Sequence, residues 1–296
     1  MTNQKKAYIF ALLAVLFWST VSTGFKLALE VIDYVQLLFI STFVATIITF
    51  VTLLFTNKLK LVLKSSSKEI GKSALVAVLN PFGYYMVLLK AYSILPAQIA
   101  QPLNYTWPVV LVLLSAPFLK QKIKKQSIIA LLVSFSGVMI IATQGNLSTL
   151  KIDQPFGVFL AAFSSVIWAL FWLLNVKDKR DEVVKLFLNF LFALVYEAIA
   201  IFFISDFNFK IDISLAPAVY VGFFELGITF IIWLKAMKLT TSNDKISNLI
   251  FLSPALALIF IRFILGEEIF YTTYIGLFFI LLGIFILNKK KKKQQL

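Results

Sequence analysis

The sequence contains no histidine and no cysteine among its 296 residues. Without cysteine the chain has no disulfide framework and no thiolate that could act as a nucleophile or metal ligand. Without histidine it lacks the commonest metal ligand and the side chain that titrates most readily near neutral pH. Ser/His/Asp catalysis is therefore excluded, and the sequence holds no phosphate-binding glycine loop and no cluster of metal ligands. We predict that the protein is not an enzyme, binds no metal and uses no cofactor.

Charged residues are also scarce, at 14% of the chain, whereas 60% of the residues are hydrophobic and the mean hydropathy is +0.91. Soluble domains typically carry about 25% charged residues. A soluble chain with this composition would expose large apolar patches and aggregate. The composition therefore predicts an all-α membrane protein that has the lipid bilayer as its solvent.

Ten stretches are apolar enough to cross a bilayer, whose core of about 30 Å needs about 20 helical residues. The connections between them are short, so consecutive helices are expected to run antiparallel. The predicted transmembrane helices are 7–29, 34–55, 70–92, 96–119, 127–143, 155–175, 184–204, 217–237, 246–265 and 271–288.

Connections that are rich in lysine and arginine alternate with connections that are poor in them. Because cytoplasmic loops are enriched in these two residues, the alternation predicts the topology. With the N-terminus inside, the external loops hold only Lys151 and Lys210. The basic residues placed inside are Lys5, Lys6, Lys58, Lys60, Lys64, Lys68, Lys72, Lys120, Lys122, Lys124, Lys125, Lys177, Lys179, Arg180, Lys185, Lys238, Lys245 and Lys289 to Lys293. We predict a multi-pass protein of the cell membrane with both termini in the cytoplasm. Because the basic residues do not form one patch, nucleic acid is not an expected partner.

The two halves of the chain, 1–150 and 151–296, resemble each other. Four matches share one register, at offsets of 150, 145, 146 and 146 residues: Trp18 with Trp168, Leu89-Lys90-Ala91 with Leu234-Lys235-Ala236, Pro108 with Pro254, and Gly137 with Gly283. Five helices in each half would make the halves enter the membrane in opposite directions, as in the inverted repeats of many transporters. The alternative is coincidence between two apolar segments.

The segments that carry these matches resemble the drug/metabolite transporter superfamily, EamA type. The resemblance covers nearly the whole chain and rests on Phe17-Trp18, Lys90-Ala91-Tyr92 and the segment from Gln101 to Pro108. Within that segment, Asn104-Tyr105-Thr106-Trp107-Pro108 is most similar to the aromatic amino-acid exporter branch. The resemblance implies metabolite export without covalent chemistry. The second half departs from the pattern, because Asn248 and Ser253-Pro254 have no matching aromatic pair.

The stretch 96–119 carries the strongest candidates for a substrate site. It is rich in proline, and each proline removes a backbone donor, so freed carbonyls must be satisfied by protein or by cavity water. Gln101, Asn104, Tyr105 and Pro108 are spaced i, i+3, i+4 and i+7 and so share one helix face. These side chains either line a substrate site, together with neighbouring Trp107, or hold helices together through hydrogen bonds.

Aromatic and amide side chains deep in other predicted spans are further candidates for substrate contacts. They are Asn80, Tyr84, Trp168, Trp172 and Asn248. The tryptophans, one helical turn apart, would either stack on a planar substrate or pack between helices.

Glu197 and Glu225 lie within predicted spans, where a charged carboxylate is unlikely to face lipid. We predict that they couple transport to protons or capture a substrate amine; the alternative is a structural pair with a lysine or an amide. Lys26, Lys90, Lys235 and Arg262 lie near span ends, where their side chains can reach the headgroups.

These patterns together predict a secondary transporter that exports small metabolites such as amino acids by alternating access, with protons as a candidate coupling ion. A carrier of drugs, sugars or nucleotide-sugars is the first alternative. A non-transporting membrane scaffold, or an intramembrane enzyme that uses only carboxylates, is the second.

Overall fold

The computed structural model describes residues 2–119, 125–144, 153–176, 178–206, 211–240 and 248–288, and this part of the chain is helical without any β-strand. Several basic residues used to predict the topology lie outside it. They are Lys120, Lys122, Lys124, Lys151, Lys177, Lys210, Lys245 and Lys289 to Lys293.

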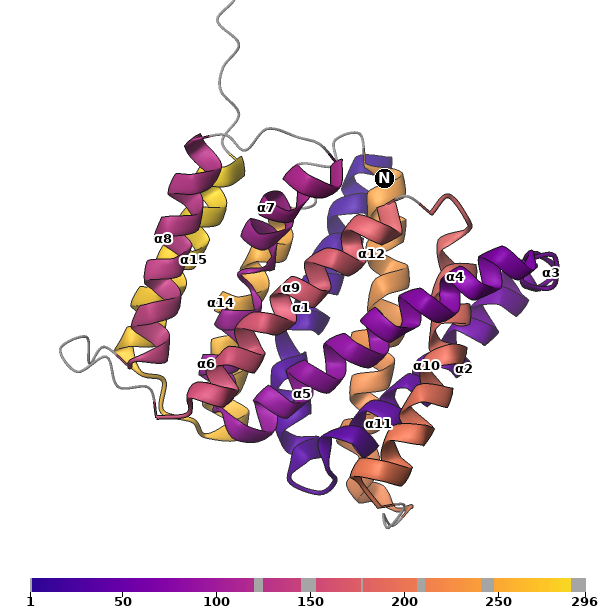
Figure 1. Cartoon of the computed structure of the whole chain (residues 1–296), viewed down its shortest axis with the longest axis horizontal. Helices are drawn as coiled ribbons and strands as arrows, with labels where there is room; N and C mark the ends of the chain where they lie inside the picture. The colour runs from indigo at the N-terminus through magenta and orange to yellow at the C-terminus, as the bar shows by residue number, and fades with distance from the viewer. Residues whose placement is uncertain are drawn as a thin grey trace, which may run out of the picture.

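The helices pack side by side in one bundle (Figure 1). In chain order they are α1 (Asn3–Leu29), α2 (Tyr34–Phe55), α3 (Leu59–Leu63), α4 (Ser67–Ala77), η1 (Val78–Gly83), α5 (Tyr84–Ile94), α6 (Ala97–Asn104), α7 (Trp107–Leu119), α8 (Lys125–Ala142), α9 (Pro155–Val176), α10 (Glu182–Ile204), η2 (Ile213–Leu215), α11 (Ala216–Val221), η3 (Gly222–Gly227), α12 (Ile228–Leu239), η4 (Asn248–Leu252), α14 (Ser253–Phe260), η5 (Ile261–Leu265) and α15 (Tyr271–Asn288).

Within the described residues, six helical stretches are long and apolar enough to cross a membrane. They are Asn3–Leu29, Tyr34–Phe55, Ser67–Ile94, Pro155–Asn175, Glu182–Ile204 and Ile213–Leu239. Shorter apolar helices cover Ile128–Ala142, Leu249–Leu265 and Tyr271–Ile286. The prediction of a helical, multi-pass membrane protein is confirmed, with six long apolar helices and three shorter ones among the described residues.

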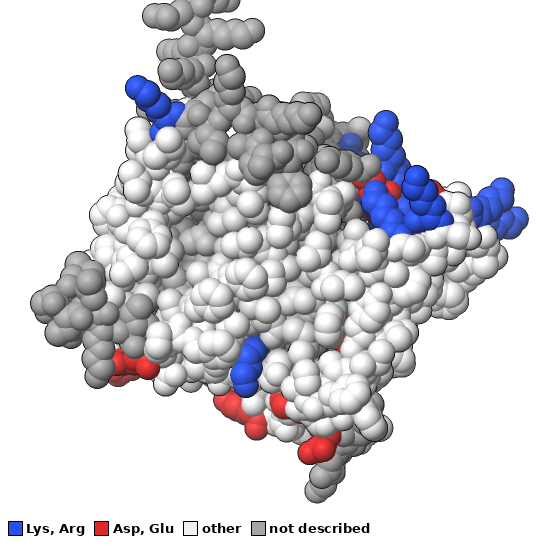
Figure 2. Space-filling view, viewed as in Figure 1, with Lys and Arg blue, Asp and Glu red and all other residues white. Residues whose placement is uncertain are grey.

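Large apolar side chains on the outside of the bundle fit a lipid environment. Phe202 and Phe203 on α10 are each 76% exposed, Phe263 on η5 is 83% exposed and Phe285 on α15 is 66% exposed. The space-filling view shows a broad band without charges, with most Lys and Arg at one edge and most Asp and Glu at the opposite edge (Figure 2). Lipid around this band removes the cost of the exposed apolar surface.

The prediction of one continuous helix over 96–119 is wrong. The structure has two helices there, α6 and α7, with Tyr105 and Thr106 between them. Pro108 has no N–H group to donate to the carbonyl of Asn104, so the i−4 ladder cannot continue through this point. The stretch 246–265 is continuously helical in the part that begins at residue 248, although the helix type changes from η4 to α14 to η5.

Two π-helical segments interrupt longer helices. The first, η1, contains Pro81, and the backbone of Asn80 leaves the helical region with φ −152° and ψ 125°. The second, η3, begins at Gly222, where a Cβ atom would lie 2.5 Å from the carbonyl oxygen of Ser41 on α2. The chain at η1 is therefore a kink between two helices, whereas η3 is a π-helical turn, a feature that occurs frequently at functional sites.

Glycine allows α8 and α15 to pack against each other at one side of the bundle (Figure 1). A Cβ atom at Gly137 would lie 2.4 Å from the carbonyl oxygen of Gly276, and one at Gly276 would lie 2.7 Å from that of Gly137. At Gly283 the carbonyl oxygen of Ala130 would be 2.7 Å away. Small residues at such contacts let backbones approach closely, which is a main source of helix association in lipid.

We predict that Gly137→Leu separates α8 from α15 and lowers the melting temperature in detergent by several degrees, because backbone atoms of α15 occupy the space of the new side chain. Gly71→Leu on α4 is the matched control, since its Cβ would meet nothing within 4 Å. If both variants melt at the wild-type temperature, the close approach of the two helices is not what holds them together.

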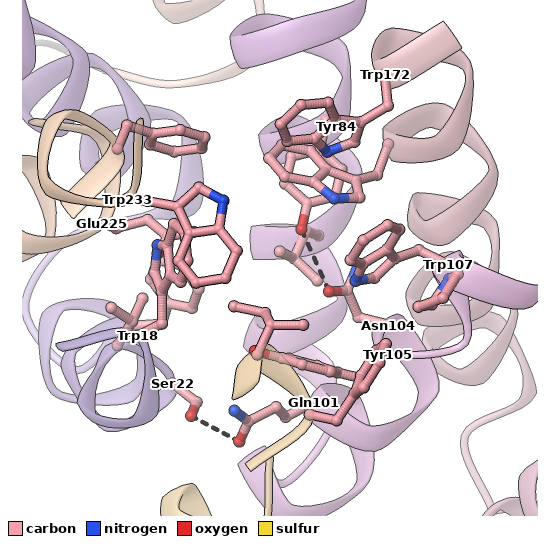
Figure 3. Close-up of a pocket in the computed structure, with 18 of the residues that line it drawn as sticks. Trp18, Ser22, Tyr84, Gln101, Asn104, Tyr105, Trp107, Trp172, Glu225 and Trp233 are labelled. Carbon is pink, nitrogen blue, oxygen red and sulfur yellow. Dashed lines mark hydrogen bonds between the residues drawn. The ribbon is translucent and has the colours of Figure 1, made fainter. Parts of the chain in front are cut away.

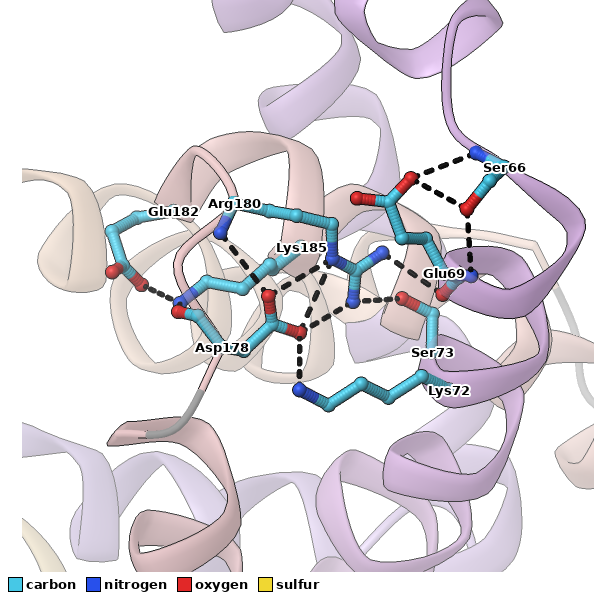
Figure 4. A network of polar contacts seen from close by, with 8 residues as sticks. All are labelled: Ser66, Glu69, Lys72, Ser73, Asp178, Arg180, Glu182 and Lys185. Carbon is cyan, nitrogen blue, oxygen red and sulfur yellow. Dashed lines mark hydrogen bonds and ion pairs between the residues drawn. The ribbon is translucent and has the colours of Figure 1, made fainter.

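An ion-pair network joins the segment before α10 to α4 (Figure 4). The Arg180 guanidinium donates to Asp178 Oδ2 at 2.7 Å, to Ser73 Oγ at 3.0 Å and to the carbonyl of Glu69 at 3.0 Å. Lys72 Nζ lies 3.2 Å from Asp178 Oδ2. Burial alone would raise the pKa of the Asp178 carboxyl, but hydrogen bonds from Arg180 and Lys72 outweigh it and hold that pKa well below its usual range.

A lowered native pKa means that the network stabilises the fold above the unfolded-state pKa of about 4 and loses this contribution as the pH falls further. We predict that Asp178→Asn lowers the free energy of unfolding by about 1–3 kcal/mol at neutral pH. The difference from wild type should shrink below about pH 4 in thermal melts. A difference that stays constant down to pH 3 would show that the carboxylate charge does not matter.

Candidate functional site

A cavity of about 390 Å³ lies in the middle of the bundle, between helices from both halves of the chain. Its walls come from α1, α5, α6, α7, α9, η3, α12 and η4. The lining residues are Trp18, Val21, Ser22, Phe25, Tyr84, Leu88, Tyr92, Gln101, Asn104, Tyr105, Trp107, Pro108, Leu111, Trp168, Trp172, Glu225, Phe230, Trp233, Met237, Ile250 and Phe251.

All five tryptophans of the chain line this cavity (Figure 3). Their rings form connected contacts: Trp18 lies 5.4 Å from Trp233 between ring centroids, and Trp168 lies 6.0 Å from Trp172. Phe230 joins the two groups, at 5.6 Å from Trp18 and 6.1 Å from Trp168. The cavity therefore has aromatic walls on both sides, which offer large flat surfaces to a ligand.

Hydrogen bonds fix the amide side chains that α6 contributes. Asn104 accepts at Oδ1 from the Tyr84 hydroxyl at 3.2 Å and donates from Nδ2 to Ser164 Oγ at 2.7 Å. Gln101 accepts from the Ser22 hydroxyl of α1 at 2.8 Å (Figure 3). These bonds set the orientation of both amides while each keeps further hydrogen-bonding capacity.

The break between α6 and α7 places this polar face against the cavity. Gln101, Asn104, Tyr105 and Pro108, which the spacing predicts to share one face, all line it. Irregular backbone at membrane depth is tolerated where it is buried in protein or lines a cavity. The position of the break therefore agrees with the physical constraint on broken membrane helices.

Glu225 in η3 brings a carboxyl group to the cavity wall. The Tyr85 hydroxyl donates to Glu225 Oε1 at 2.7 Å. Among the described residues that line the cavity, Glu225 carries the single charged side chain, and none is Lys or Arg.

Other predicted site residues lie elsewhere. Glu197 is fully buried between α10 and α2, where Thr42 Oγ1 donates to its Oε1 at 2.9 Å, and it does not line the cavity. Asn80 is buried in η1 and is also not part of the lining. The side chain of Asn248 lies outside the described part of the chain. By contrast, the cavity brings together Tyr84, Gln101, Asn104, Tyr105, Trp107, Trp168, Trp172 and Glu225.

None of the site residues that we predict from the sequence lies on α1, although α1 contributes to the cavity wall. Trp18 is used in the predictions as the repeat partner of Trp168 and as part of the family resemblance but not as a site residue, and Ser22 is not named at all. The signal that could have found them is the cluster of small hydroxyl residues at 19–23 beside a tryptophan in an apolar helix. Such hydroxyls are common where membrane helices approach each other or a polar site.

At the end of the bundle that carries most acidic residues (Figures 1 and 2), side chains tie several helices together. Lys26 Nζ on α1 donates to the carbonyls of Tyr92 and Leu95 at 3.1 and 3.2 Å. The Glu267 carboxylate accepts from the first backbone N–H groups of α6, from Ala97 at 2.9 Å and Gln98 at 3.3 Å. Lys26 therefore binds backbone carbonyls within the protein instead of reaching to headgroups.

A model of the EamA-like transporter family matches residues 5–143 and again 155–289. The chain belongs to the EamA-like transporter family. This confirms the resemblance to EamA-type members of the drug/metabolite transporter superfamily, and it favours transport over catalysis.

Individual EamA-like relatives agree with this assignment. An uncharacterized transporter of Clostridium kluyveri is 27% identical over 299 residues, covering 98% of this chain and 95% of the relative. The uncharacterized transporter YyaM of Bacillus subtilis is 25% identical over 252 residues, covering 81% and 79%. One solved crystal structure has the same fold, with a TM-score of 0.67 and 18% identity over 96% of both chains.

If the cavity is hydrated, a water-soluble thiol reagent should reach it, and the EamA-like chain has no native cysteine to interfere. We predict that Leu111→Cys, on the cavity wall, reacts with a small charged methanethiosulfonate reagent. Ala45→Cys is the control, because Ala45 is fully buried on α2 and does not line the cavity. Failure of the folded Leu111→Cys variant to react at a higher rate than the control would show that the cavity is closed to water.

Proposed function

We propose that this protein is a secondary transporter that exports small metabolites, amino acids among them, across the cytoplasmic membrane by alternating access. The observation that carries the proposal is the central cavity, with its polar face, aromatic walls and single carboxylate, inside a multi-pass member of a transporter family. Ligand pockets are typically apolar clefts of about 300–1,000 Å³ with a few placed polar groups, and this cavity fits that description.

Ten transmembrane helices in two inverted repeats would give the carrier its moving parts. The helix contacts support this arrangement. If each span is replaced by the equivalent span of the other half, every one of the following contacts becomes another of them or itself. The first predicted span packs on the eighth (α1 on α12), and the sixth packs on the third (α9 on α5). The second span packs on the seventh (α2 on α10), and the fifth on the tenth (α8 on α15).

The helix interruptions are related in the same way. η1 and η3 lie 144 residues apart, close to the offset of 145 between Leu89 and Leu234, and this supports corresponding places in the two halves. The two consecutive matches to the family model, one in each half, also support a duplicated unit. The boundary proposed for the repeats is residue 150.

Charge separation supports the proposed orientation. Most described Lys and Arg side chains lie at the edge of the bundle where the N-terminus lies, and most Asp and Glu lie at the other edge (Figures 1 and 2). Basic residues mark the cytoplasmic side of membrane proteins. Both termini are therefore proposed to lie in the cytoplasm.

Glu225 is the proposed coupling group, because its carboxyl group meets the cavity and can exchange a proton for a ligand. Glu197 is the second candidate, although its carboxyl group lies between α2 and α10 and contacts Thr42. The alternative cargoes are drugs, sugars or nucleotide-sugars. The last of these is disfavoured by the cavity, because phosphate groups call for Lys or Arg and the described lining offers neither.

The proposal is tested with proteoliposomes that are loaded with a mixture of amino acids, amines, sugars and nucleotide-sugars. Compounds that leave faster than from protein-free vesicles are identified by mass spectrometry, under an imposed proton gradient. Export of at least one compound class is expected. If every compound stays inside at the rate of empty vesicles, in protein shown to be folded, the transporter proposal is wrong.

For the compound that leaves, we predict that Glu225→Gln reduces gradient-driven flux at least about tenfold and flattens its pH dependence, because the exchangeable proton is gone. Glu197→Gln is measured beside it, and Asp212→Asn, on the exposed surface, is the control. A flattened pH profile in Glu197→Gln alone would show that Glu197, and not Glu225, carries the coupling proton. Unchanged profiles in both variants would exclude coupling through either carboxyl group.

A further inference from the structure

We propose that the cavity is built for an organic cation, meaning an amine or quaternary ammonium group on an aromatic or otherwise apolar body. The inference rests on the proposed transport function and narrows its substrate class. Within that class it sets amines apart from zwitterionic amino acids and from anions.

The charge balance of the cavity favours a cation. Glu225 supplies one negative charge, and no Lys or Arg is among the described lining residues. A carboxylate buried at membrane depth needs a proton or a cation as partner, because an unpaired charge in a poorly hydrated site is costly. A monocationic ligand supplies that partner, whereas a zwitterion would bring its own unpaired carboxylate.

The basic groups nearest to the cavity already have partners within the protein. Lys26 lies one helical turn beyond Ser22 on α1, but its Nζ donates to two backbone carbonyls, those of Tyr92 and Leu95. Lys235 on α12 has its Nζ 4.7 Å from the centre of the Phe10 ring. A ligand carboxylate would therefore have to rely on neutral donors such as the amides of Gln101 and Asn104.

The aromatic walls of the cavity also suit a cation. Tryptophan is the best aromatic partner for a cation, because its ring face carries partial negative charge, and sites for quaternary ammonium groups are often aromatic cages. This cavity gathers all five tryptophans of the chain, from α1, α7, α9 and α12. In Figure 3, Trp18 and Trp233 lie on the side of Glu225, and Trp107 and Trp172 lie on the opposite side.

The position of the carboxylate completes the site. Glu225 sits in the π-helical η3 segment and is held by the Tyr85 hydroxyl at 2.7 Å, with Trp18 and Trp233 near it (Figure 3). The ammonium group would bind at Glu225 and the apolar body would lie between the tryptophan walls. The amides of Gln101 and Asn104 would meet a neutral polar group on the ligand.

Three ligands with one phenyl body and different charges test this inference: phenylethylamine, phenylalanine and 3-phenylpropanoate. Because every tryptophan lines the cavity, intrinsic tryptophan fluorescence reports binding, and a phenyl ring does not emit in that range. Near neutral pH we expect the amine to bind at least about tenfold more tightly than the zwitterion and the anion not to bind measurably. Benzyltrimethylammonium, which cannot lose its charge, should bind like the amine.

Glu225→Gln should weaken binding of both cations at least about tenfold, and Glu225→Asp should retain part of it because the charge remains. Asp212→Asn, which removes an exposed carboxylate, is the control. Each variant is checked by its melting temperature, so that loss of binding is read only from folded protein.

Tighter binding of phenylalanine or 3-phenylpropanoate than of phenylethylamine would overturn the inference, and so would unchanged cation binding in folded Glu225→Gln. Neither result would affect the transport proposal, because vesicle export of a neutral or zwitterionic compound could still be observed. Conversely, preferential binding of the cations without export of any compound from vesicles would support the cation site and contradict the proposed transport function.

Discussion

The structure depends on one constraint, which is that backbone polar groups in lipid must find partners within the protein. Regular helices meet it by themselves, and breaks are tolerated only where protein or a water-filled cavity satisfies the freed groups. Two of the breaks in this chain, at Tyr105–Thr106 and in η3, lie at residues that line the same cavity. The irregular backbone and the polar side chains therefore meet at the same central cavity, where a carrier would bind its substrate.

The cavity combines little charge with much aromatic surface. Its single described carboxylate, at Glu225, is held by a tyrosine hydroxyl, and its amides are oriented by hydrogen bonds to Tyr84, Ser22 and Ser164. Pre-oriented polar groups lose little freedom when a ligand binds, so few of them are enough to give specificity. The α8–α15 pair lies at one side of the bundle, where glycines let the two helices pack closely.

Much of the fold could be predicted from hydropathy, because spans such as 34–55 are uniformly apolar and end at polar residues. The face formed by Gln101, Asn104, Tyr105 and Pro108 could be predicted because helical spacing sets it before tertiary contacts form. The break after Asn104 could not be located, since proline is often accommodated in continuous membrane helices. The separate environments of Glu197 and Glu225 could not be told apart either, because each depends on which helix packs against it. The contribution of Trp18 and Ser22 depends in the same way on how α1 meets α6 and α12.

Hydrogen–deuterium exchange of the protein in lipid nanodiscs would show whether the helix breaks meet a hydrated cavity, because it reports which backbone amides inside the membrane meet water. We predict fast exchange at residues 104–107 and 222–227, slow exchange in the middle of α2 and α15, and slower exchange at the first two segments when a cavity ligand is added. Equal protection of all four segments would contradict it, because the helix breaks would then face no hydrated cavity.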